Sequence, residues 1–187
     1  MTLTSSTMMP LGTRAPDFSL LDVCSGTLAT LQESAGAQGT LVAFICNHCP
    51  YVRHIEDELI ELAWDFQPRG IAVVAICAND AATHPEDGPI PMKDRASAKG
   101  YPFPYFYDDT QDVARAYNAV CTPDLFLFDG QLNCVYRGQF DASRPGNDIE
   151  VTGADLRRAC DALLTGDPIN PDQTPSMGCN IKWKSPA

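Results

Sequence analysis

The stretch that decides the fold is Thr-Leu-Val-Ala-Phe-Ile-Cys-Asn-His-Cys-Pro-Tyr-Val, residues 40–52. Residues 40–45 form a short apolar run with the length of one strand. Cys46 and Cys49 follow directly, and Pro50 suits the first turn of a helix, where its missing N–H costs nothing. The stretch therefore predicts a strand that leads through a Cys-x-x-Cys motif into a helix.

An amphipathic helix is predicted after the motif. Its apolar residues recur at steps of three and four, which places them on one face. They are Val52, Ile55, Leu59, Leu62 and Phe66. Arg69 and Gly70 are expected to end this helix, and the apolar run 71–77 predicts a strand buried on both faces of a sheet.

Shorter elements are predicted on either side of this unit. They are an early strand into which residues 15–20 lead, a helix around 92–99, a strand at 105–107 and a helix near 111–117. Asp129-Gly130 separates the apolar runs 125–128 and 132–136, which is a strong hairpin signal. Thr152, with Asp155 three residues on, resembles a capping box that opens a last helix.

The order of these elements predicts one α/β domain over residues 1–187, with a mixed central sheet and helices on both faces. Residues 1–11 are expected to be a loose arm. Residues 167–187 are rich in proline and are expected to be an irregular tail.

The composition argues against several classes of function. The formal net charge of −11 repels phosphate backbones, so we expect no nucleic-acid partner. No run reaches the roughly 18 apolar residues of a membrane span. The first twenty residues lack the pattern of a secretory signal, which predicts a cytoplasmic protein, although a periplasmic protein without its signal would look the same.

The Cys46–Cys49 pair carries the predicted chemistry, because a helix start stabilises a thiolate and a thiolate is the nucleophilic form of cysteine. His48 offers a positive neighbour. Most of the eight cysteines are expected to be small core residues. The predicted function is thiol–disulfide exchange without a cofactor.

Two alternatives to redox chemistry stay open. The first is metal binding: a Cys-x-x-Cys is also half of a zinc site, although the sequence has no second such motif and no His-x-x-x-His. Such a metal-binding module would use Cys46, His48, Cys49 and Cys121 as soft ligands. The second is a redox-inert interaction domain, since fold does not fix function.

Five stretches together resemble the peroxiredoxin-like branch of the thioredoxin superfamily, whose members are named redoxin or alkyl hydroperoxide reductase. They are 46–52, 121–129, 136–138, 143–146 and 178–183. The resemblance extends over about residues 12–184. It implies a thioredoxin fold of three layers, α/β/α, and a thioredoxin-type thiol as the external reductant.

The resemblance also implies that Pro123 is a cis-proline facing the cysteine pair, which leaves Thr122 free to hydrogen-bond an extended substrate chain. Peroxiredoxins have a proline and a threonine where Val42 and Cys46 stand here, and an arginine close to the Thr122-Pro123 position. Those groups activate peroxide, so these departures argue against peroxidase activity. Thioredoxins have tryptophan where this sequence has Ile45.

Two catalytic cycles remain. In a thioredoxin-like cycle, which we favour, Cys46 attacks a protein disulfide and Cys49 resolves the mixed disulfide. In a peroxidase cycle, that of an antioxidant enzyme, Cys49 attacks a peroxide and another thiol captures the sulfenic acid. Cys121 and Cys179 are candidate auxiliary thiols. The sequence leaves the oligomeric state open.

Overall fold

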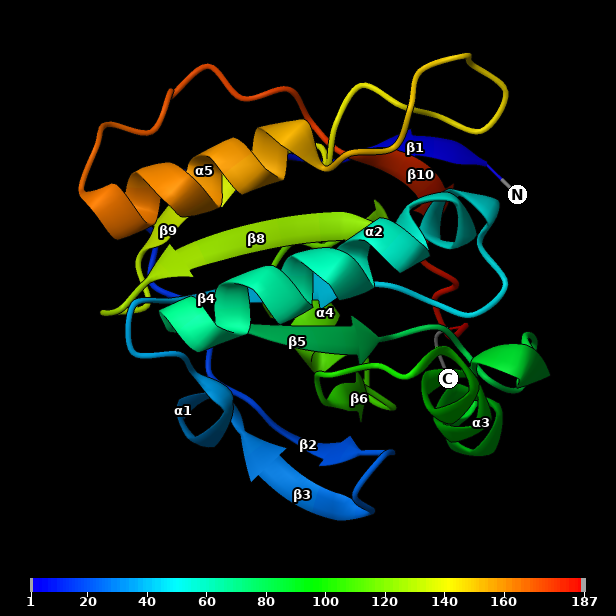
Figure 1. Ribbon diagram of the computed structural model, residues 1–187. Coiled ribbons are helices and arrows are strands. Elements are labelled where there is room, and N and C mark those ends of the chain that lie inside the picture. Colours follow the sequence, from blue (N-terminus) through cyan, green and yellow to red (C-terminus); the bar gives the residue numbers. More distant parts are fainter. Residues whose placement is uncertain (1, 186–187) are drawn as a thin grey trace.

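A seven-stranded mixed sheet forms the middle of the molecule (Figure 1). The computed structural model describes residues 2–185 of the chain. The strands lie side by side in the order β3-β2-β6-β5-β4-β8-β9. Their bounds are Ser19–Asp22 (β2), Thr27–Thr30 (β3), Gly39–Phe44 (β4), Ile71–Cys77 (β5), Tyr105–Tyr107 (β6), Asp124–Asp129 (β8) and Cys134–Arg137 (β9).

Helices cover both faces of this sheet. Their bounds are Leu31–Ser34 (α1), Pro50–Phe66 (α2), Pro89–Lys99 (α3), Asp112–Ala116 (α4) and Ala154–Thr165 (α5), with 3₁₀ turns at Gln67–Arg69 and Pro85–Asp87. Side chains of α2, α3 and α5 join one apolar cluster, and side chains of α1 and α4 join a second. The predicted three-layer architecture with a mixed central sheet is confirmed.

The position of β4 in the middle of the sheet explains its apolar sequence. It pairs in parallel with β5 and antiparallel with β8, and all of its residues are buried. Leu41 and Ala43 belong to the cluster that includes α2, whereas Val42 and Phe44 belong to the opposite cluster. Because successive side chains of a strand point to opposite faces, both faces must be apolar here. This packing fixes where β4 delivers Cys46.

Most predicted elements are present, some with shifted ends. The strands at 71–77 and 105–107 are β5 and β6, and the hairpin around Asp129-Gly130 is β8 with β9. The helix from Pro50 ends at Phe66 and continues as a 3₁₀ turn. The early strand into which residues 15–20 lead is β2, Ser19–Asp22.

The capping box predicted for Thr152 and Asp155 is wrong. The N-cap residue of α5 is Gly153, which has no side chain to offer. Asp141, from the loop after β9, accepts hydrogen bonds from the backbone N–H groups of Thr152 at 2.8 Å and Gly153 at 2.7 Å. A carboxylate distant in sequence therefore satisfies the start of this helix.

The descriptions of residues 1–11 as a loose arm and of residues 167–187 as an irregular tail also need correction within residues 2–11 and 167–185, whereas residues 1, 186 and 187 lie outside the described residues. A separate three-stranded sheet has the order β1-β10-β7, with β1 at Leu3–Ser5, β7 at Cys121–Thr122 and β10 at Met177–Asn180. Both pairings are antiparallel. In Figure 1 β1, from the first residues of the chain, thus lies beside β10, from its last part. The tail reaches the cysteine pair through β7.

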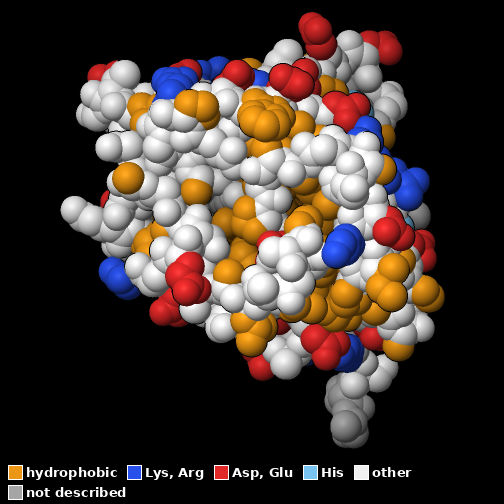
Figure 2. Space-filling model, turned by 60° about the horizontal axis from the view of Figure 1, so that its bottom comes forward, with side chains coloured by type: hydrophobic (Ala, Val, Ile, Leu, Met, Phe, Trp, Pro, Cys, Tyr) orange, Lys and Arg blue, Asp and Glu red, His pale blue; other side chains and the backbone are white. Residues whose placement is uncertain are grey.

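The surface mixes charged and apolar groups. On the face shown in Figure 2, acidic and basic side chains lie mainly around the margin, and apolar side chains are exposed between them. Among residues 2–185, no helix combines the length and the apolar character that crossing a membrane requires.

Replacement of Asp141 by alanine should destabilise the fold. Although burial favours the neutral acid, hydrogen bonds from Ser143, Thr152 and Gly153 hold the pKa of Asp141 below its usual value. D141A should therefore lower the free energy of unfolding by about 1–3 kcal/mol at neutral pH. Because the folded-state pKa is lowered, this stabilisation exists above the unfolded-state pKa and is lost as the pH falls through the folded-state pKa.

Urea denaturation at several pH values measures this effect, with D148A at an exposed position as the matched control. The control should change the free energy of unfolding by less than about 0.5 kcal/mol. Equal stability of D141A and D148A at neutral pH would refute the capping role.

Candidate active site

Cys46 and Cys49 lie between the end of β4 and the start of α2. Cys49 is the N-cap residue of α2, and Pro50 follows in the first turn. The two cysteines are 1% and 0% exposed and belong to the apolar cluster that includes α2. A helix N-terminus has N–H groups without intrahelical partners, which stabilise a negative charge placed there. All eight cysteines are thiols in this structure.

The Thr122–Pro123 peptide lies against this pair. Its bond is cis. The Sγ of Cys49 is 3.1 Å from the Thr122 carbonyl oxygen, and the Sγ of Cys46 is 3.4 Å from the Thr122 Oγ1. One residue of β7 therefore contacts both sulfurs, and the proline next to it occupies the place that the family resemblance implies.

The negative charge of the pair resides on Cys49. A hydrogen bond from the Cys46 thiol lowers the pKa of Cys49 to about 5 against the opposing effect of burial, and Cys179, Thr122 and a backbone N–H of the first helical turn also donate to this sulfur. The pKa of Cys46 is raised, because its proton is held in the bond to Cys49, because it is buried and because Asp87 is close. The neutral Cys49 thiol can donate to the Thr122 carbonyl oxygen. When Cys49 ionises it loses this bond, but the four hydrogen bonds that its sulfur accepts stabilise the thiolate by more.

Asp87 organises the two residues between the cysteines. Its Oδ1 accepts from the backbone N–H groups of Asn47 at 2.8 Å and His48 at 3.3 Å. Its Oδ2 lies 2.5 Å from the His48 Nδ1 and accepts from Asn79 at 2.8 Å. Burial opposes ionisation, but these bonds hold the pKa of Asp87 below its usual value. His48, whose Nδ1 lies 3.8 Å from the Cys46 Sγ, is thus hydrogen-bonded to Asp87 as well as being a neighbour of the cysteine pair.

The tail strand β10 brings a third thiol to the same place. Cys179 pairs directly with Thr122 across the β10–β7 ladder and is 3% exposed. Burial and a hydrogen bond to Cys49 raise the pKa of Cys179 to about 12. The expectation that Thr122 is free for a substrate chain is thus wrong, because β10 occupies its edge. Cys121 lies one residue away along β7, and its thiol donates to the Pro123 carbonyl oxygen at 3.6 Å.

Residues 11–137 match the AhpC/TSA family model. The chain belongs to the AhpC/TSA family. An uncharacterized conserved protein from Geobacillus kaustophilus is 52% identical, with a TM-score of 0.98 over 100% of this chain and 99% of that chain. A hypothetical protein from Sinorhizobium meliloti 1021 is 50% identical, with a TM-score of 0.95 over 98% of this chain and 100% of that chain. No curated protein matches the sequence.

A more distant solved structure shares the fold. It is a putative thiol:disulfide interchange protein DsbE from Chlorobium tepidum, 20% identical, with a TM-score of 0.66 over 84% of this chain and 99% of that chain. The predicted membership of the redoxin branch is confirmed, and this AhpC/TSA protein has the thioredoxin fold.

A buried arginine of this AhpC/TSA protein packs against the strand that follows the cis-proline. Arg137 is 1% exposed, and its Nη2 lies 3.3 Å from the Oδ2 of Asp124. Its guanidinium lies over the Phe126 ring at 4.5 Å from the centroid, and it donates to the Asn118 carbonyl oxygen. Arg137 therefore joins the strand that follows the cis-proline to the neighbouring loop.

The soft ligands proposed from the sequence are grouped differently in this AhpC/TSA protein. Cys46, His48 and Asp87 offer ligand atoms that lie within 4.8 Å of one another. The Nε2 of His48 is buried and has no hydrogen-bond partner within residues 2–185. Cys121 is not part of this group, whereas the carboxylate of Asp87 is. The arrangement can present one sulfur, one nitrogen and one oxygen to a cation.

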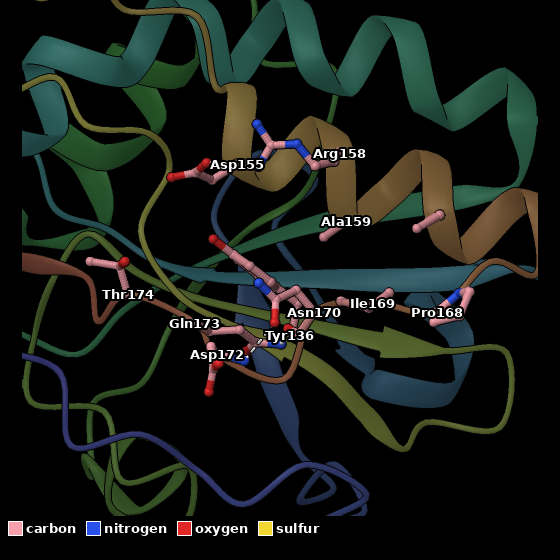
Figure 3. Close-up of a pocket in the computed structure, with 11 residues that line it drawn as sticks. Tyr136, Asp155, Arg158, Ala159, Pro168, Ile169, Asn170, Asp172, Gln173 and Thr174 are labelled. Carbon is pink, nitrogen blue, oxygen red and sulfur yellow. Dashed lines mark hydrogen bonds and ion pairs between the residues drawn. The ribbon is translucent and has the colours of Figure 1, made fainter.

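The cavity of about 350 Å³ that Figure 3 shows lies elsewhere in this AhpC/TSA protein. Side chains of α5, including Asp155 and Arg158, line one side of it, and residues 168–170 and 172–174 of the tail line the other. Tyr136 of β9 points into it. None of the cysteines lines it, so it is separate from the Cys46–Cys49 pair.

Sequence reasoning missed Asp87 and did not predict the structural role of Gly178. Asp87 lies in a loop rich in proline, aspartate and glycine, where nothing in the local pattern sets one carboxylate apart. Gly178 lies beside Cys179, and a Cβ there would come within 2.0 Å of the Thr122 carbonyl oxygen. A glycine is required here because the pairing of β10 with β7 brings its backbone against the Thr122 peptide.

The thiolate of this AhpC/TSA protein should be visible by absorbance at ~240 nm, where thiolates but not thiols absorb. In the reduced wild-type protein the signal should be present at neutral pH and disappear as the pH falls through about 5, the lowered pKa of Cys49. C49S should remove this titration. C46A should move it upward, because the largest hydrogen bond to the thiolate is lost.

The exposed Cys24 provides the matched control, since C24S should leave the titration near pH 5 unchanged. A reduced wild-type protein whose first thiol titrates only above pH 8, like an ordinary cysteine, would contradict the assignment of the charge.

Proposed function

We propose that this protein is a thiol–disulfide oxidoreductase that works through the Cys46–Cys49 couple. The observation that carries the proposal is the contact of both sulfurs with Thr122, next to the cis-proline, at the start of α2. This arrangement supports exchange because it stabilises one thiolate and keeps a second thiol in hydrogen-bonding contact with it.

The charge distribution supports Cys49 as the first nucleophile. Its thiolate attacks one sulfur of a substrate disulfide, the substrate S–S bond breaks, and the leaving thiolate takes up a proton. Cys46 then loses its proton and attacks the Sγ of Cys49. The Cys46–Cys49 disulfide forms and the second substrate thiol leaves. This order reverses the roles expected from the sequence but gives the same product.

The oxidised protein needs a reductant to complete the cycle. We propose a thioredoxin-type thiol as the donor and the cytoplasm as the compartment, where a disulfide formed during turnover is reduced again. Two electrons then pass from the donor to the substrate for each turnover.

Peroxide reduction is the second candidate, and the low pKa of Cys49 favours it. Cys49 would attack one peroxide oxygen, become a sulfenic acid and release water, and Cys46 would then form the same disulfide with loss of a second water. The positions that hold the peroxide-activating proline and threonine in peroxiredoxins contain Val42 and Cys46 here, which argues for disulfides as the preferred substrate.

Parallel assays of the reduced protein with insulin and with hydrogen peroxide test the proposal. We expect rapid loss of two thiols to the insulin disulfide, with Cys46 and Cys49 joined in the peptide map, and a slow reaction with peroxide. C46S and C49S should each abolish turnover of insulin, whereas C24S should retain it.

The opposite preference, with fast sulfenic acid formation at Cys49 and little reaction with insulin, would make the protein a peroxidase. If neither reagent oxidises the pair, both redox functions fail. Zinc bound by the reduced protein and lost in D87N would then identify the group of Cys46, His48 and Asp87 as a metal site.

A further inference from the structure

We propose that β10 is a resident substrate strand of the redox site and that Cys179 is its third redox thiol, able to take over the disulfide at Cys49. The proposal rests on the proposed function and deepens it, because it adds a disulfide partner that the chain itself supplies. It is carried by the position of β10 on β7, by the contact of its backbone with the cis-proline peptide and by the sulfur contacts at Cys49.

The register of the β10–β7 ladder directs Cys179 toward the pair. Residues directly opposite in an antiparallel ladder have side chains on the same face. Cys179 is opposite Thr122, and the Thr122 side chain points to the Sγ of Cys46 at 3.4 Å. The carbonyl oxygen of the same residue lies 3.1 Å from the Sγ of Cys49. The Cys179 side chain therefore faces the sulfurs.

The backbone of β10 approaches this peptide as closely as a main chain can. A Cβ at Gly178 would lie 2.0 Å from the Thr122 carbonyl oxygen and 3.1 Å from the Pro123 nitrogen. Such contacts leave room for glycine alone, because no Cβ is tolerated so near a backbone atom. The segment before Cys179 is thus fitted to the cis-proline peptide.

Hydrogen bonds hold the tail on both sides of the sulfur. Before Cys179, the Ser6 N–H donates to the Ser176 carbonyl oxygen at 2.8 Å. After it, the Ile181 N–H donates to the Val120 carbonyl oxygen at 3.0 Å, and the Lys182 N–H donates to the Oδ1 of Asn79 at 2.8 Å. Cys179 is therefore presented by an ordered strand, as an extended polypeptide substrate would present its cysteine.

The exchange step balances without an external oxidant. When Cys49 is bonded to Cys46 or to a substrate thiol, Cys179 loses its proton and attacks the Sγ of Cys49. The Cys49–Cys179 bond forms, the older S–S bond breaks, and the leaving sulfur takes up the proton. In the reduced state the Cys49 thiolate helps to raise the pKa of Cys179, and that contribution ends once Cys49 is in a disulfide.

The C46A variant tests this step, because it retains Cys49 and Cys179 but cannot form the Cys46–Cys49 bond. Treated with oxidised glutathione, it should pass through a glutathione adduct to a Cys49–Cys179 disulfide, identified by non-reducing peptide mapping. In C46A the adduct is resolved by Cys179, an intramolecular thiol with an effective concentration of about millimolar. In C46A/C179A only reduced glutathione in solution can resolve it. At about micromolar reduced glutathione, the adduct in C46A should therefore resolve about a thousandfold faster. C46A/C24S is the matched control and should resolve like C46A.

G178V in the C46A background supplies an independent test. Its side chain should displace β10 from Thr122, so the glutathione adduct at Cys49 should persist and no Cys49–Cys179 disulfide should form. Circular dichroism of both variants establishes that they fold. A long-lived Cys49 glutathione adduct in folded C46A, with Cys179 still a thiol, would overturn the proposal.

The outcomes separate this proposal from the proposed function. Failure to reduce insulin, together with a Cys49–Cys179 bond in C46A, would overturn the oxidoreductase function but support Cys179 as a third redox thiol. Reduction of insulin by the wild type, with no such bond in C46A, would support the oxidoreductase function and overturn the role of Cys179.

Discussion

Thr122 is the residue on which the site depends. Its carbonyl oxygen contacts Cys49, its hydroxyl contacts Cys46, and its backbone pairs with Cys179. Three segments far apart in sequence meet at this residue: the β4–α2 junction, the cis-proline loop and the tail. Because the junction is fixed by the packing of β4 on both faces and the tail by its strand pairing, the sulfurs are held together by the fold itself.

Charge in the buried site follows the same geometry. Asp87 lies close to Cys46, so a thiolate there would face a carboxylate in a place with little water. Cys49 faces thiol, hydroxyl and backbone donors at the start of a helix. The two ends of one motif, three residues apart, thus have opposite electrostatic surroundings. The hydrogen bond between His48 and Asp87 helps to keep this carboxylate ionised.

Local patterns predicted the centre of the fold well, because β4, α2 and β5 are apolar with the period of their own elements. They failed where partners come from distant segments. The start of α5 depends on Asp141, and Asp87 is distinguished only by the groups that converge on it. The capping box of α1, with Thr30 and Glu33, is a local signal that the sequence does contain and that was overlooked.

The tail shows why the site was predicted only in part. Cys179 has no periodic pattern around it, since β10 is short and follows a proline-rich stretch, so its strand exists through pairing with β1 and β7. The need for glycine at position 178 comes from the Thr122 peptide, which leaves no room for a Cβ there. Because that pairing covers the pair, the thiolate at Cys49 is stabilised by hydrogen bonds in place of water. Access to the sulfurs is therefore coupled to the tail, and a strand that closes the site also carries a thiol into it.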